Sequence, residues 1–274
     1  MRVRPTVFPD QFALGHALAT RIADGIEAAT SEGRRYVLGC PGGRSAMTTY
    51  AGLASLVIHR RLDLSGLVIA MMDEYVDLDE ASGTFAPIAD HLQHSCRGFG
   101  REIIAAPLSA AAGPGRGIAT EHLWVPDPAD PQAYDRALAA VGGVDLFILA
   151  SGASDGHVAF NPPGTPADST TRVVPLVEST RRDNLATFPH LETVDRVPRH
   201  GVTVGVDTIR RHSKRAVMIV HGADKRTAAA RLAGAEGYDR DWPATVFTEC
   251  AQPELFVDAA AAPGGSESPD ITRS

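Results

Sequence analysis

The chain has 274 residues, of which 44% are hydrophobic, and a formal net charge of −7. This length can bury one large core, while the acidic balance disfavours nucleic acid or an anionic membrane as the main partner. No apolar run approaches the roughly 20 residues of a membrane span, and the three widely spaced cysteines show no metal-ligand pattern. We therefore predict a soluble, cytoplasmic protein with reduced thiols.

The first part of the chain alternates between helix and strand patterns. Residues 11–29 have the apolar spacing of an amphipathic helix, and residues 36–40 follow as the first predicted strand. Residues 46–62 predict a second helix, ahead of a second apolar strand at 67–72. Residues 77–100 predict a loop and then a helix, whose two histidines lack a third partner and so make a poor metal site.

The later part of the chain is less regular. Residues 98–119, rich in Gly and Ala, predict a long flexible loop. Residues 131–141 predict a short helix before a third apolar strand at 144–149. Residues 161–197 carry few periodic signals, which favours a lid or binding loops. An alanine-rich helix is predicted at 227–235.

Strands that are each followed by a turn and a helical pattern predict an α/β fold. We expect a doubly wound, mostly parallel, Rossmann-like sheet with helices on both faces. Residues 1–258 are predicted to form a single domain, because no interior linker divides them. Residues 259–274, with their Pro-Gly-Gly and Ser-Glu-Ser-Pro, predict a disordered tail.

The first predicted strand is followed by a glycine turn. Gly42, Gly43, Arg44 and Ser45 lie between this strand and the next predicted helix. Free backbone N–H groups and the positive end of a helix dipole favour an anion there, and glycine lets the backbone approach a phosphate closely. The turn matches neither common nucleotide-binding pattern. It is also compatible with a tight connection that has no ligand.

Carboxylates follow the second and third strands. Asp73 and Glu74 come directly after an apolar run, where they are costly unless solvated, paired or used. Asp73 is the better candidate to face a crevice, and Glu74 is equally compatible with a solvated turn. Asp155 and His157 follow the third strand, separated by one glycine. Such a carboxylate can fix the imidazole tautomer and stabilise its charged form, as an acid–base histidine needs. Taken alone, the spacing is equally compatible with a hydrogen-bonded pair in a surface turn.

Four stretches together point to one family. They are Leu38-Gly39-Cys40-Pro41-Gly42-Gly43, Met72-Asp73-Glu74-Tyr75-Val76, Asp155-Gly156-His157-Val158-Ala159-Phe160-Asn161 and Val197-Pro198-Arg199-His200-Gly201-Val202-Thr203-Val204-Gly205-Val206 with the later Lys225. In this order they resemble the glucosamine-6-phosphate deaminases, from about residue 1 to 257 with an apparent insertion near 97–117. The glycine turn is shared with the 6-phosphogluconolactonases, a sister branch.

The resemblance implies a chemistry for these residues. Members of the family open an amino-sugar 6-phosphate ring, move a proton between C2 and C1 and release ammonia to leave a ketose phosphate. Asp73 then corresponds to the carboxylate base, His157 to the imidazole that assists ring opening, and Asp155 to the carboxylate that orients it. Lys225 corresponds to a phosphate-binding cation. The resemblance implies a small sugar phosphate as the partner and requires no metal or organic cofactor.

Two departures from the family pattern indicate an altered specificity. Pro162 stands where the deaminases have a glutamate that completes the ring-opening relay, and proline can neither titrate nor donate a backbone hydrogen bond. Ala186 stands where they have a phosphate-binding arginine. Arg44 enters the glycine turn in place of a small residue and offers a bidentate guanidinium for an anion. It is also compatible with a surface residue beside a degenerate pocket.

Two other activities stay open at this point. A lactonase of the 6-phosphogluconolactonase type would use the histidine to activate water, although such enzymes usually have Arg at the position of Tyr75. A non-catalytic protein that binds a sugar phosphate is the other alternative. The sequence leaves the oligomeric state open, including a homo-oligomer.

Overall fold

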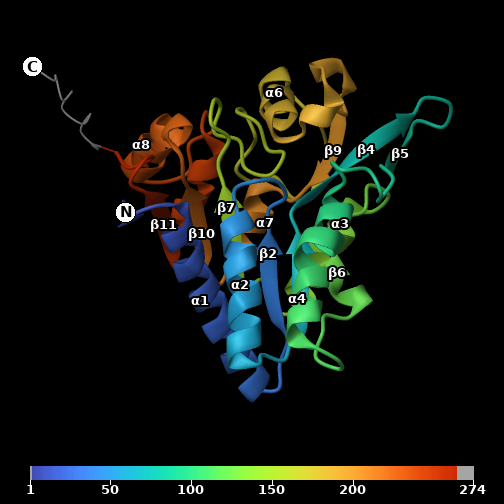
Figure 1. Cartoon of the computed structure of the whole chain (residues 1–274). Coiled ribbons are helices and arrows are strands. Elements are labelled where there is room, and N and C mark those ends of the chain that lie inside the picture. Colours follow the sequence, from blue (N-terminus) through green and yellow to red (C-terminus); the bar gives the residue numbers. More distant parts are fainter. Residues whose placement is uncertain (1, 264–274) are drawn as a thin grey trace, which may run out of the picture.

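The computed structural model describes residues 2–263, which build a seven-stranded parallel sheet and a smaller antiparallel one (Figure 1). The parallel sheet has the strand order β1-β11-β10-β7-β2-β3-β6. The bounds of its strands in that order are Pro5–Phe8, Pro253–Asp258, Ala216–Val220, Leu146–Ala150, Tyr36–Cys40, Leu67–Met71 and Leu123–Trp124. Every residue of β2, β3 and β10 is buried, as expected for strands covered on both faces.

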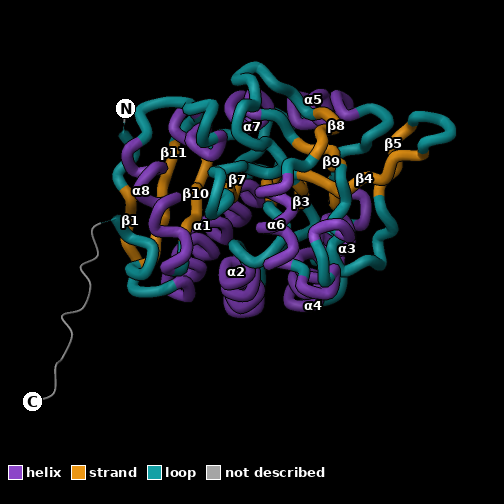
Figure 2. The backbone as a smooth tube through the Cα atoms, turned by 90° about the horizontal axis from the view of Figure 1, so that it is seen from above, coloured by secondary structure: helices purple, strands orange, loops and turns teal. Residues whose placement is uncertain are grey.

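Helices cover both faces of this sheet, which confirms the predicted doubly wound architecture (Figure 2). One face packs against α1, α2 and α4, and the other against α5, α7 and α8. The helices α1 to α8 span Gln11–Ser31, Met47–Arg60, Cys96–Phe99, Ala106–Ala112, Pro131–Ala140, Glu178–Thr187, Val206–His212 and Arg226–Gly234.

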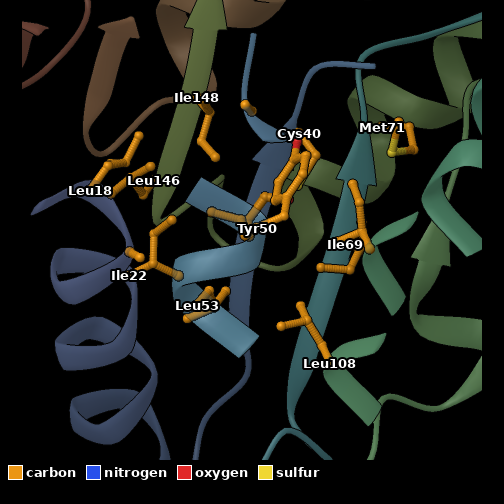
Figure 3. Close-up of a cluster of buried hydrophobic side chains, with 14 of the residues drawn as sticks. Leu18, Ile22, Cys40, Tyr50, Leu53, Ile69, Met71, Leu108, Leu146 and Ile148 are labelled. Carbon is orange, nitrogen blue, oxygen red and sulfur yellow. The ribbon is translucent and has the colours of Figure 1, made fainter. Parts of the chain in front are cut away.

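Alternating strand side chains divide the core into two layers. In β7, Ile148 faces α1 and α2 while Phe147 faces the opposite helices. Ile22 of α1 and Leu53 of α2 fill the first layer, and both are fully buried (Figure 3). Burying an aliphatic side chain of this size contributes about 1.5–3 kcal/mol. In the second layer, a Cβ at Gly39 would lie 2.1 Å from the Phe147 ring, so glycine permits this packing.

The antiparallel sheet has the order β5-β4-β9-β8, with bounds Thr84–Pro87, Asp73–Asp79, His200–Thr203 and Arg172–Pro175. Met72 is the single residue between β3 and β4. Its N–H donates to the carbonyl of Cys40 in the parallel sheet, and its carbonyl accepts from Val204 next to β9. The turn expected after the second apolar strand is therefore wrong: at Asp73 the chain crosses from one sheet into the other.

Residues 98–119, predicted as a long flexible loop, are largely helical. α3 runs into a π-helical turn at Gly100–Ala105 and then into α4. The alanines favour a helix, and Pro107 lies in the first turn of α4, where a missing N–H is tolerated. The wide turn brings the N–H of Ala106 to the carbonyl of Arg101. The helix expected within residues 77–100 begins only at Cys96, because β4 and β5 occupy the start of that segment.

Other boundaries also differ from the expectations. β1 precedes the first predicted strand and pairs with β11 at the edge of the sheet. The aperiodic stretch 161–197 contains β8, α6 and two short 3₁₀ turns. Residues 259–261 form a turn, and 264–274 of the expected tail lie outside the described residues. Among residues 2–263, no helix has the length and apolar character needed to span a membrane.

Candidate active site

A cavity of about 460 Å³ opens at the carboxyl ends of β2, β3, β7 and β10. Ligands bind at this edge in open α/β sheets. The glycine turn, the start of β4, the loop after β7 and the start of α8 all contribute to its wall, and α6 adds a further side. All the predicted site residues line the cavity except Asp155, which lies behind His157.

Asp73 is the first residue of β4 and is only 7% exposed. Burial raises the pKa of its carboxyl from the ordinary 3.8 to about 7, although a hydrogen bond from the Cys96 thiol opposes the rise. The Cys96 Sγ lies 3.2 Å from the Asp73 Oδ1. A carboxyl group that titrates near neutral pH and faces a cavity is well suited to remove and return a proton.

Glu74 points away from this cavity, because successive side chains of a strand face opposite sides. Its carboxylate accepts four hydrogen bonds, from the N–H groups of Tyr75, Cys96 and Arg97 and from the Ser95 hydroxyl, at 2.8–2.9 Å. It therefore ties β4 to the first turn of α3. The solvated turn left open for Glu74 is wrong, since the residue is fully buried and structural.

Asp155 and His157 form a close pair in the loop after β7. The Nδ1 of His157 lies 2.7 Å from the Asp155 Oδ1, and the Ser179 hydroxyl donates to Oδ2 at 2.7 Å. Burial acts to raise the pKa of Asp155, but the hydrogen bonds from His157 and Ser179 outweigh it and hold this pKa well below its usual range. The ionised carboxylate favours the proton on Nδ1, which leaves Nε2 for a ligand.

Glycines make this pair possible. A Cβ at Gly152 would lie 2.3 Å from the His157 Nδ1 and 2.6 Å from the Asp155 Oδ1, so only glycine leaves room for both groups. Gly156 has a φ of +68° and packs against the Trp242 ring, where a Cβ would lie 2.2 Å from a ring carbon. The Asp-Gly-His spacing is thus a steric requirement of the loop as well as a chemical pattern.

The anion-binding end of the cavity combines the glycine turn with two cations. Lys225 precedes α8, and its Nζ donates to the carbonyl of Ser151. Burial lowers the pKa of Lys225, and the charge of Arg44 lowers it further, so the two cations act on each other. Ala46 occupies the N-cap position of α2, and no side chain caps this helix.

Several cavity residues were not singled out from the sequence. Cys96 reaches Asp73 from α3, and Asp183, Asn184, Thr187 and Phe188 lie on α6 or at its end. The sequence indicated only that a lid or binding loops lie in this region. A thiol 23 positions from its carboxylate partner has no sequence signal at all.

Comparisons with known proteins identify a family. The chain matches the family model of glucosamine-6-phosphate isomerases/6-phosphogluconolactonase over residues 9–256. It is 36% identical over 249 residues to a glucosamine-6-phosphate deaminase of Beutenbergia cavernae, covering 89% of this chain and 87% of the relative. It is 33% identical over 232 residues to one of Streptomyces avermitilis, covering 82% and 78%.

Solved structures show the same fold. A monomeric glucosamine-6-phosphate deaminase superposes with a TM-score of 0.79 at 24% identity, covering 94% of this chain and 98% of its own. A 6-phosphogluconolactonase from Thermotoga maritima superposes with a TM-score of 0.64 at 18% identity, covering 93% and 99%. Taken with the match over nearly the whole chain, these findings show that the chain belongs to the glucosamine-6-phosphate isomerase/6-phosphogluconolactonase family.

Proposed function

We propose that the chain is an aldose–ketose isomerase and deaminase that acts on an amino-sugar phosphate or a related sugar phosphate. The observation that carries this proposal is the pairing of Asp73 and His157 on one cavity wall. The Asp73 carboxyl has a pKa raised to about 7 by burial, while His157 is held by an ionised Asp155. Two acid–base groups in different environments suit two different proton transfers.

In the proposed reaction, His157 assists ring opening. The C1–O5 bond breaks with its electron pair on O5, O5 takes a proton from His157, and the O1 hydroxyl loses its proton to solvent as C1=O1 forms. Asp73 then takes the proton from C2 while O1 gains a proton from solvent, which gives an enolamine. Asp73 returns its proton to C1, and the C2–N bond becomes an iminium. Water adds at C2, a proton passes from the added water to the nitrogen, and ammonia leaves as C2=O forms and the remaining proton returns to solvent, which yields the ketose. Each positioned proton transfer contributes about 10²–10⁴ in rate.

We further propose that Arg44 and Lys225 bind the anionic group of the substrate and alter its specificity relative to the deaminases. Both cations line the cavity beside Gly42 and Gly43, and Arg44 repels Lys225, although the Asp183 and Asp224 carboxylates partly offset the Lys225 charge. A phosphate at this point would relieve that repulsion and accept backbone N–H groups from the glycine turn. Arg44 would thereby take over the role of the arginine that the sequence lacks at Ala186.

A panel of amino-sugar phosphates, neutral sugar phosphates and 6-phosphogluconolactone tests the proposal, with the Asp73→Asn variant as a control. We expect ammonia and ketose from an amino-sugar phosphate with the unaltered enzyme and a loss of both with the variant. Lactone hydrolysis without ketose formation would replace the proposal by a lactonase. Thermal stabilisation by a sugar phosphate without any turnover would replace it by a binding protein.

A further inference from the structure

α6 docks on the Asp155–His157 pair through one face. The Ser179 hydroxyl donates to the Asp155 Oδ2 at 2.7 Å, and the Thr180 hydroxyl lies 3.4 Å from the same oxygen. Asp183 comes four residues after Ser179 and therefore lies on the same side of the helix. The helix thus presents a carboxylate toward the pair that its hydroxyls already contact.

Asp183 reaches His157 at close range. A carboxylate oxygen of Asp183, one of Asp155 and a ring nitrogen of His157 all lie within 4.8 Å of one another. The Ser154 hydroxyl holds the Asp183 carboxylate, at 3.3 and 3.4 Å from its two oxygens. Asp183 lines the cavity. Pro162 directly follows Asn161, so the loop offers no carboxylate at that position.

We propose that Asp183 is a second carboxylate partner of His157 and holds the imidazole in its protonated, proton-donating form during ring opening. This role rests on the proposed function and supplies from α6 the charge that Pro162 cannot supply. An anion within a few ångströms favours the charged form of an imidazole. Asp183 acts through His157 and is therefore a positioning residue.

The other charged groups around His157 fit this role. Asp155 faces it from its own loop and Asp73 from β4, and the charge of His157 in turn lowers the pKa of Asp73. Lys225, at the start of α8, opposes them, but it also feels the Asp183 carboxylate, which partly offsets its positive charge. Removing Asp183 would therefore take away an anion and leave Lys225 less compensated. Both changes disfavour the imidazolium.

Titration of His157 by NMR tests the proposal without any substrate. Replacing Asp183 by Asn should lower the pH at which the ring is half protonated. Asp224→Asn removes a cavity carboxylate outside this cluster, and Ser179→Ala loosens α6 without removing a charge; neither should lower it comparably. An unchanged midpoint in Asp183→Asn, or an equal fall in Asp224→Asn, would overturn the proposal.

Kinetics supply a second measurement that separates this role from a general loss of folding. Asp183→Asn should reduce kcat/KM on a cyclic substrate about tenfold, but much less when His157 is already replaced by Gln. Equal losses in both backgrounds would show that Asp183 does not act through His157. If no substrate in the panel turns over while the midpoint still falls, the proposed function fails and the Asp183–His157 coupling stands.

Discussion

Asp73→Asn should abolish activity and, at the same time, raise the free energy of unfolding. Asparagine keeps the shape of the side chain and an oxygen that can accept the Cys96 hydrogen bond, but it carries no charge to desolvate. Burial raises the pKa of Asp73 from 3.8 in the unfolded chain to about 7 in the folded one. Between pH 3.8 and about 7, Asp73 is therefore protonated in the folded protein but ionised in the unfolded chain.

The size of the effect follows from this gap. Roughly three pH units at about 1.4 kcal/mol each give a cost of about 4 kcal/mol at neutral pH, as an order of magnitude. The cost is absent below pH 3.8, where both states are protonated, grows as the pH rises, and is complete above about 7. For a chain of this length we expect Asp73→Asn to raise Tm by about 5–10 °C at pH 8.

Thermal unfolding of both proteins between pH 4.5 and 8 measures the effect, and kcat is followed in parallel. The difference in Tm should shrink toward the acid end, and kcat at pH 8 should fall by about 10²-fold or more. Equal stability at pH 8, or a difference that grows as the pH falls, would refute the burial of an ionisable Asp73. A variant that interconverts aldose and ketose at the unaltered rate would refute its role as the base.

Three further variants test the rest of the site. Cys96→Ala removes the hydrogen bond that lowers the pKa of Asp73. The acidic limb of the pH profile of kcat/KM should therefore move to higher pH. An acidic limb at the same pH would contradict a hydrogen bond between Cys96 and Asp73. Lys225→Met should raise KM at least tenfold for phosphorylated sugars and less for unphosphorylated sugars. An equal rise in KM for both kinds of sugar would argue against an anion site at Lys225. His157→Gln should impair turnover of a cyclic substrate more than of an open-chain analogue, and an equal effect on both would exclude a role in ring opening.

Much of the fold could be predicted because its strands are short apolar runs that end at small or acidic residues. β2, β3 and β7 are each visible in the sequence as a buried run followed by small or acidic residues, and the segments after them converge on one edge of the sheet. The side chains that follow these strands therefore share a cavity. The positions of Asp73 and His157 follow from this local rule, which needs no knowledge of long-range contacts.

The antiparallel sheet and the lid helix could not be predicted in this way. β8 and β9 have four residues each, and they are stabilised by pairing with each other and with β4 rather than by a pattern of their own. α6 is mostly polar and ends without a clear signal, so its register against the Asp155–His157 pair depends on tertiary contacts. Asp183 comes from α6, whereas Cys96 is the first residue of α3 and meets Asp73 only through tertiary packing.

The adjacent carboxylates Asp73 and Glu74 have different and complementary roles. Glu74 receives hydrogen bonds from the first turn of α3 and so fixes the position of Cys96. The Cys96 thiol in turn donates to Asp73 and moderates the basicity that burial gives it. Successive side chains of a strand point in opposite directions. Glu74 can therefore fix the position of α3, and Asp73 is buried against that helix on the side of the cavity. This pair of acids looks costly in the sequence, and burial raises the pKa of both carboxyls. Hydrogen bonds from α3 offset part of that cost at Glu74, whereas Asp73 has only the Cys96 thiol and faces the cavity.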